Sequence, residues 1–147
     1  MASLLDLKNQ LNRIKVIKIG EKIMPDIKTI PPVPTLFSED AENFAKQLNV
    51  SAKTKNENTA TQIRRFYDEL ITWYNRIGDD EAKFTQYIAF IKMLNAKAAY
   101  AKGRKLVNDE FVNWFKDCIS QVDSPATLRN FRLHFEAVLG FLKGIRG

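Results

Sequence analysis

Hydrophobic and polar positions alternate weakly in the first third of the chain and with clear helical periodicity in the rest. Near the start, apolar residues recur at heptad-like spacing: Leu4, Leu7, Leu11 and Ile14. This spacing predicts a short amphipathic helix over residues 1–18, with its lysines and arginine in solvent. Such a helix needs a partner surface for its apolar side.

A proline-rich stretch follows over residues 20–37 and predicts an extended connector, because proline removes amide donors and blocks helix formation. Ser38 is a suitable N-cap for a short helix whose apolar edge includes Phe44 and Leu48. The polar, unpatterned sequence that ends at Asn58 indicates a domain boundary. We therefore expect two parts: an amino-terminal helical and extended extension, residues 1–58, and a helical-bundle domain, residues 59–147.

Capping signals separate four apolar-faced segments in the second part. Thr59 and Gln62 resemble a capping box, and Gly78 is a suitable stop for the helix that they begin. The next helix, over residues 79–102, is apolar around most of its circumference, so we expect it to be the central one. A third helix follows Asn108, and a fourth begins at the Ser-Pro pair 124–125. The pattern predicts an all-α fold, a compact bundle of about four to five helices.

Composition narrows the classes of function. The 147 residues include 23 Lys and Arg against 17 Asp and Glu, a net charge of +6 that favours an anionic partner, nucleic acid first. No apolar run reaches the roughly 18 to 20 residues that span a bilayer, and the amino terminus lacks the pattern of a secretory signal. We expect a soluble protein of the cytoplasm with no membrane partner.

Catalytic and metal-binding patterns are weak. The single histidine, His134, has no nucleophile or paired carboxylate at helical spacing, so a surface or packed structural role is favoured. The acidic run 79–81 is better explained as a helix cap than as a metal site, because consecutive helical positions diverge by about 100°. One cysteine, Cys118, can form neither an intrachain disulfide nor a zinc site. We therefore expect no enzyme activity, no metal and no cofactor.

A basic and aromatic stripe is the main candidate for binding. Counting about 100° per residue along the helix 79–102 and on to Arg104 places four side chains within one narrow sector: Met93, Lys97, Tyr100 and Arg104. Cations neutralise phosphates, and a tyrosine ring packs on a ribose or stacks on a base, which suits a surface over which RNA passes. The alternative is a solvated helix face with Tyr100 half-buried.

Three segments together resemble the small helical subunit of type III-A CRISPR effector complexes, the Csm type. They are TATQIRRFYDEL at 59–70, LNAKAAYAKGR at 94–104 and FRLHFEAVLGFLK at 131–143. The resemblance covers about the last 89 residues and departs from the family at Asn95 and Ala96, where relatives often have a lysine-proline pair. We recognise no counterpart for the first 58 residues.

The resemblance implies a non-catalytic subunit that lines the path of guide RNA and target RNA and contacts backbone and large subunits and neighbouring copies of itself. It implies RNA contacts at seven positions: Arg64, Arg65, Lys97, Tyr100, Lys102, Arg104 and Arg129. Three rival interpretations remain. The first is a helical adaptor that binds only proteins, through Trp73 and the amino-terminal amphipathic helix. The others are a helix-turn-helix DNA-binding protein and an uncharacterised enzyme.

Overall fold

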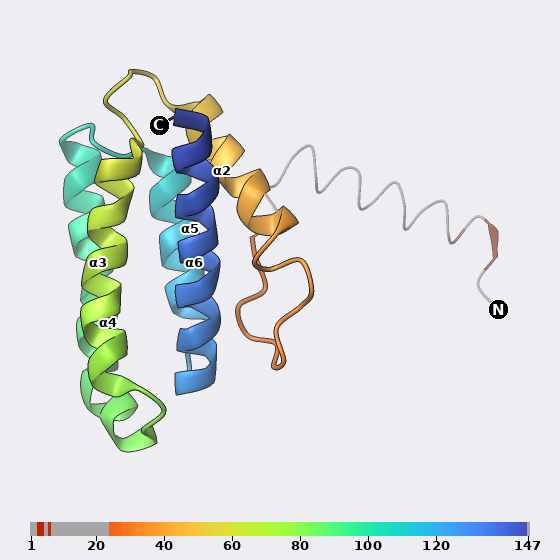
Figure 1. Cartoon of the computed structure of the whole chain (residues 1–147), viewed down its shortest axis with the longest axis vertical. Helices are drawn as coiled ribbons and strands as arrows, with labels where there is room; N and C mark the ends of the chain where they lie inside the picture. The colour runs from red at the N-terminus through yellow and green to blue at the C-terminus, as the bar shows by residue number, and fades with distance from the viewer. Residues whose placement is uncertain (1–2, 5, 7–23, 147) are drawn as a thin grey trace.

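The computed structural model describes residues 3–4, 6 and 24–146, and this part of the chain folds as five α-helices without strands. They are α2 (Glu39–Ser51), α3 (Ala60–Ile77), α4 (Glu81–Gly103), α5 (Asp109–Ser120) and α6 (Pro125–Arg146). Figure 1 shows α3 to α6 side by side as a bundle, with α2 inclined against α6. The predicted all-α bundle is confirmed, whereas the helix predicted over residues 1–18 lies almost entirely outside the described residues.

The helix ends follow the capping signals of the sequence, although Ser38, the residue directly before α2, makes no side-chain cap hydrogen bond. Thr59 Oγ1 accepts a hydrogen bond from the backbone N–H of Gln62 at 3.2 Å, and Gly78, at a φ of 55°, ends α3. At the start of α6, Ser124 Oγ accepts a hydrogen bond from the backbone N–H of Thr127, also at 3.2 Å. Each cap satisfies an amide that has no partner within its helix, so these boundaries are determined locally.

The central helix of the bundle is α6, and the prediction that the helix 79–102 is central is wrong. α6 packs against α2 on one side and α3 on the other, and it buries Phe131 and Phe135 (Figure 1). α4 packs against α3 and α5 at the edge of the bundle, and it leaves Phe90 and Met93 42% and 51% exposed. Apolar residues around a whole helix do not indicate which neighbours cover it, and here one apolar side of α4 faces solvent.

One hydrophobic core includes residues from both sides of the boundary that we predicted after residue 58. Ile27 and Leu36 of the proline-rich segment are buried in it together with Phe44 and Leu48 of α2. Asn58 is fully buried, and its side-chain amide donates a hydrogen bond to Leu48 O at 3.1 Å. Its Oδ1 accepts a hydrogen bond at 3.2 Å from the backbone N–H of Asn108, the N-cap of α5. A polar residue that satisfies backbone groups leaves no hydrophobic signature, so the sequence pattern did not reveal this packing.

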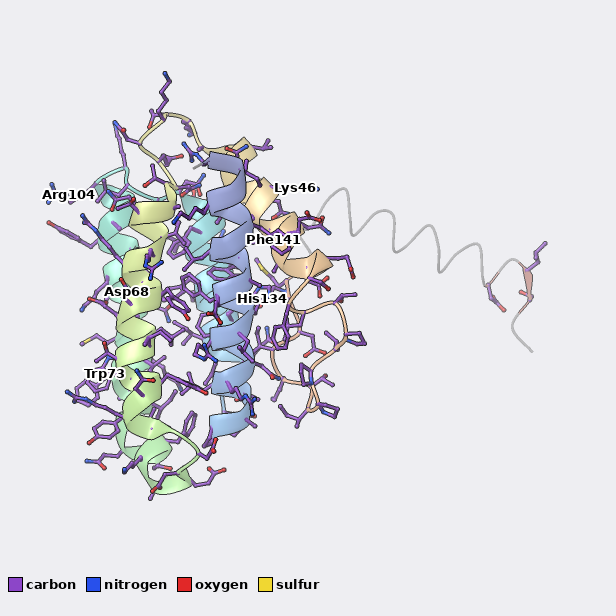
Figure 2. The ribbon with its side chains drawn as sticks, in the orientation of Figure 1. Lys46, Asp68, Trp73, Arg104, His134 and Phe141 are labelled. Atoms are coloured by element: carbon purple, nitrogen blue, oxygen red, sulfur yellow. The ribbon has the colours of Figure 1, made fainter. Side chains whose placement is uncertain are left out.

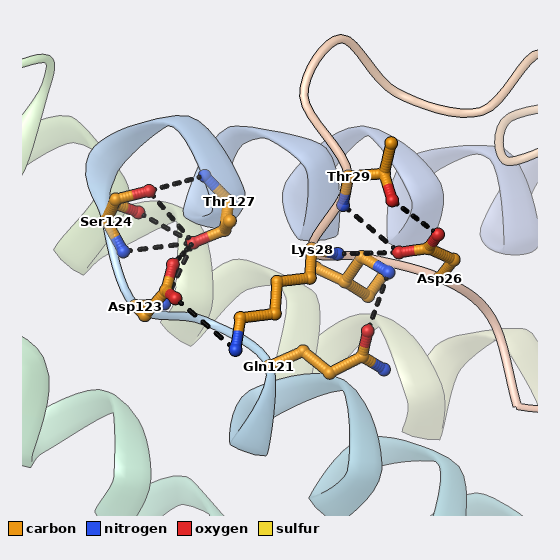
Figure 3. A network of polar contacts seen from close by, with 8 residues as sticks. Asp26, Lys28, Thr29, Gln121, Asp123, Ser124 and Thr127 are labelled. Atoms are coloured by element: carbon orange, nitrogen blue, oxygen red, sulfur yellow. Dashed lines mark hydrogen bonds and ion pairs between the residues drawn. The ribbon is translucent and has the colours of Figure 1, made fainter.

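Buried and half-buried side-chain amides at the end of α5 and in α6 form hydrogen bonds with the backbone of the proline-rich segment. Figure 3 shows Gln121, at the end of α5, beside this segment; its Oε1 accepts the Ile27 N–H and its Nε2 donates to Pro25 O, both at 2.9 Å. Further along, Asn130 of α6 donates to Ile27 O at 3.0 Å. An irregular segment has no internal hydrogen-bond ladder, so side chains must satisfy its backbone groups when it packs on a core.

His134 of α6 is a third side chain that hydrogen-bonds a backbone group of the proline-rich segment, and the structure confirms a packed histidine. The ring is fully buried, and Nδ1 lies 2.6 Å from Leu36 O while Nε2 lies 3.2 Å from Nε1 of Trp114. Because the carbonyl can only accept and the indole N–H can only donate, the ring is neutral with its proton on Nδ1. Burial lowers the pKa of His134 below its usual 6.5, and the bond to Leu36 only partly opposes that shift.

This lowered pKa predicts that stability decreases in mild acid. The unfolded chain takes up a proton at His134 near pH 6.5 and the folded chain does so only at lower pH, so the free energy of unfolding falls as the pH drops below about 6.5. Urea unfolding followed by circular dichroism at pH 7.5, 6.5 and 5.5 measures this. His134→Gln should remove most of the pH dependence in that interval; an unchanged dependence would assign it to other groups.

Candidate nucleic-acid interface

The predicted stripe on α4 is exposed along its whole length. Met93, Lys97, Tyr100 and Arg104 all face solvent, and Tyr100 is 66% exposed. Arg104 Nη1 donates to Tyr100 Oη at 3.2 Å, and the guanidinium carbon lies 5.8 Å from the centroid of the tyrosine ring. The expectation, within the alternative of a solvated helix face, that Tyr100 is half-buried is therefore wrong. An aromatic face and a cation are held together at the end of α4, as stacking and phosphate contact require.

Lys97 connects this stripe to α3. Its Nζ lies 2.9 Å from Glu69 Oε1, and both side chains are about half exposed. Since an exposed ion pair contributes little stability, a phosphate could replace the carboxylate at small cost. The contact also shows how α3 and α4 align: positions before Glu69 lie beside positions after Lys97.

The register places Arg65 next to the Tyr100–Arg104 end of α4. Arg65 is four residues before Glu69, so it lies on the same side of α3, and it is exposed. Arg64 points about 100° around the helix and lies 3.7 Å from Asp68 in an exposed ion pair. The two arginines therefore occupy neighbouring sides of the same helix end, and of the two only Arg65 faces the α4 stripe.

Lys102 and Arg129 have different surroundings. Lys102, near the end of α4, forms an ion pair with Asp109 at the start of α5, and both side chains are exposed. Arg129 is exposed near the start of α6, which lies at the opposite end of the bundle from the end of α4 (Figure 1). Six of the seven predicted positions thus lie at one end of the α3–α4 pair, and Arg129 does not lie with them.

An aromatic cluster that sequence reasoning did not assemble lies further along the same two helices. Trp73 of α3 stacks on Phe90 of α4 with ring centroids 4.8 Å apart and planes at 9°, and Tyr87 packs beside them. The Arg76 guanidinium lies 5.0 Å from the Trp73 ring. Figure 2 labels Trp73 and Arg104 at separate places along this pair of helices. Two features of the sequence could have predicted this cluster: Trp73 lies outside the inward face of α3, and α4 has apolar residues on a second side, which includes Phe90.

The described residues contain neither a cluster of metal ligands nor a membrane-spanning helix. Among them, no three His, Cys, Asp or Glu side chains come close enough together to hold a metal ion. None of the described helices is both long and apolar enough to cross a bilayer. The buried Cys118 is unavailable to a partner, and burial raises the pKa of its thiol well above the usual value.

Comparison with known proteins places this arrangement in a family. The family model for Csm2 of type III-A matches residues 33–147, which includes α2 to α6 and the six clustered positions. The match begins before residue 59, so the expectation that the first 58 residues have no counterpart is wrong for residues 33–58. Searches of curated proteins and of solved structures found no significant match. Because the family model covers well over half of the chain, the protein belongs to the Csm2 family, the small subunits of type III-A CRISPR effector complexes.

Proposed function

We propose that this subunit binds RNA without catalysing its cleavage, and that it lines the path of the guide and target RNA in the effector complex. The observation that supports the proposal best is the clustering of Arg65, Lys97, Tyr100 and Arg104 at one end of α3 and α4, with Arg104 held against the Tyr100 ring. Arg64 and Lys102 extend this basic end on either side, while Arg129 is proposed as a separate contact.

Recognition in this proposal depends on shape and charge rather than on sequence. Base pairing with the guide supplies specificity, and the cationic side chains contact the ribose-phosphate backbone whatever the base. Three of the cations already have carboxylate partners, at Glu69, Asp68 and Asp109. RNA would exchange these carboxylates for phosphates, so each contact is weak and binding becomes tight only when several subunits act along one strand.

The partners follow from the same proposal. In the cytoplasm, backbone and large subunits of the effector complex, together with neighbouring copies of the small subunit, would hold the basic end of α3 and α4 against the RNA. The net charge of +6 favours such association with a polyanion.

Salt-dependent binding tests the proposal. We expect the Arg64→Ala, Lys97→Ala, Arg104→Ala triple variant to bind single-stranded RNA more weakly than the wild type. The slope of log affinity against log salt should fall by about two, since each phosphate contact contributes about 0.7 for single strands. Fluorescence anisotropy with labelled RNA between low and moderate salt measures both quantities, for the protein alone and within the assembled complex.

A matched variant separates local contacts from net charge. Lys28→Ala, Lys83→Ala and Lys116→Ala remove the same charge from exposed positions on other parts of the bundle. This variant should retain most of the affinity and the slope. Equal losses in the two triple variants would mean that binding is non-specific, and no loss in either, with the complex assembled, would contradict the proposed surface.

The exposed apolar side chains of α4 favour a second candidate, a protein-only adaptor. Phe90 and Met93 are 42% and 51% exposed next to the aromatic cluster, as expected for a subunit contact. Under this alternative, Phe90→Ser with Met93→Ser prevents assembly with the other subunits, and the triple alanine variant leaves RNA affinity of the complex unchanged.

A further inference from the structure

A groove follows α2 along the side that meets α5. Its first part is a cavity of about 670 Å³ whose lining includes Met24, Phe44 and Trp114. A second hollow, of about 320 Å³, extends to Val50 at the end of α2. The two share three lining residues, Lys46, Gln47 and Glu110. They therefore form one continuous groove from Met24 to Val50.

The groove combines accessible apolar side chains at its two ends with acidic edges. Phe44 is only 8% exposed and Trp114 is fully buried, so accessible apolar side chains are the half-buried Met24 at one end and Val50, which is 82% exposed, at the other. The carboxylates that line the first part are Asp26, Asp40 and Glu110, against a single lysine. That lysine, Lys46, lies 3.9 Å from Glu42. A complementary occupant would place apolar side chains on the surface between Met24 and Val50 and cations beside the carboxylates.

The amino-terminal segment of the same chain has this combination. Residues 1–23 include the apolar series that recurs at heptad-like spacing, Leu4, Leu7, Leu11 and Ile14. They also carry five cations, Lys8, Arg13, Lys15, Lys18 and Lys22, against two carboxylates, Asp6 and Glu21. The segment is thus amphipathic and basic, and the groove is apolar and acidic.

The described residues at the start of the segment begin a helix. The Ser3 N–H donates to the Asp6 carboxylate at 3.2 Å, and the Asp6 N–H donates to Ser3 Oγ at 3.1 Å, which is a reciprocal capping box. Leu4 and Asp6 are helical, and Leu4 is 86% exposed. Covering an apolar side chain of this kind on a complementary surface is favourable.

The attachment point brings segment and groove together. Met24 lines the groove and directly follows residues 1–23, so this segment is covalently attached at the edge of the groove. Tethering makes the local concentration of the segment millimolar or higher, so modest contacts suffice for occupancy. We infer that residues 1–23 bind as an amphipathic helix in the α2–α5 groove of their own chain, with the leucine side on the surface between Met24 and Val50. This inference concerns no RNA contact and is independent of the proposed function.

Paramagnetic relaxation in the full-length protein tests the inference. A nitroxide is attached at Lys8→Cys; the buried Cys118 does not react, and the wild-type chain taken through the same labelling confirms this. The side-chain amide signals of the groove residues Asn43, Gln47 and Asn113 should lose most of their intensity and recover after the nitroxide is reduced. The Gln86 amide on α4 should be unaffected. Unchanged groove signals would overturn the inference.

Two further arms identify the occupant. Mixing spin-labelled chain without isotope with isotope-labelled chain without nitroxide should give no loss at the groove; a loss would show that another copy's segment binds there and would overturn binding within one chain. Leu7→Ser with Leu11→Ser should abolish the loss in the labelled chain. The matched variant Asn9→Ser with Asn12→Ser, on the polar side, should retain it, and equal behaviour of the two pairs would overturn the amphipathic mode.

Discussion

Replacing Trp114 with alanine is expected to lower the free energy of unfolding by about 3–5 kcal/mol. The indole is fully buried, stacks on Phe44 and meets Phe135 edge-on with ring centroids 5.0 Å apart. Alanine would leave a cavity among these rings and would remove the N–H that His134 Nε2 accepts. The second effect adds to the first, because an unpaired acceptor remains buried in the core.

Urea unfolding followed by circular dichroism measures this loss, and the second tryptophan of the chain provides a matched control. Trp73 is only partly buried, on the outer side of α3. Trp73→Ala should therefore cost clearly less than Trp114→Ala. Similar losses for the two variants would contradict the assignment of Trp114 to the centre of the core.

A chain that starts at residue 59 is expected to lose cooperative folding. It would lack Ile27, Leu36, Phe44 and Leu48, which are buried in the core, and would expose the side of α6 that they cover. At about 1.5–3 kcal/mol for each buried side chain, the loss is about 6–12 kcal/mol. Total stabilities are only about 5–15 kcal/mol, so little or none would remain. His134 would also lose the Leu36 carbonyl.

A chain that starts at residue 24 is the matched control for this truncation. It keeps every described side chain of the core and should unfold cooperatively, as judged by thermal and urea transitions. The truncation at residue 59 also tests the boundary predicted from the sequence. A stable, cooperatively folded fragment 59–147 would support that boundary and would show that α2 contributes little to the bundle.

Local signals in the sequence were sufficient for the helices themselves. Thr59 and Gly78 delimit α3, and Ser124 begins α6, because a cap depends on a few adjacent residues and its own backbone. Periodicity likewise predicted an apolar face for α3 and for α5, and each helix buries such a face. It did not identify the central helix, since an apolar circumference such as that of α4 fits several positions in a bundle.

The candidate site was only partly predictable for a similar reason. The spacing of Lys97, Tyr100 and Arg104 within one helix placed them on one side of α4, and the structure agrees. Their relation to Arg65 depends on how α3 and α4 align, which the Lys97–Glu69 contact shows across 28 residues of sequence. The distance of Arg129 from the others likewise follows from the direction in which α6 runs.

By itself, the sequence determined the all-α class, the ends of the helices and the basic stripe of α4, because these depend on periodicity and on neighbouring residues. Only the tertiary structure decided that α6 is central, that Asn58 and His134 are buried, and that the proline-rich segment belongs to the core. The physical reason is that these features depend on which surfaces pack together. A buried amide or imidazole has the same sequence pattern as an exposed one until its hydrogen-bond partners, far away in the chain, are known.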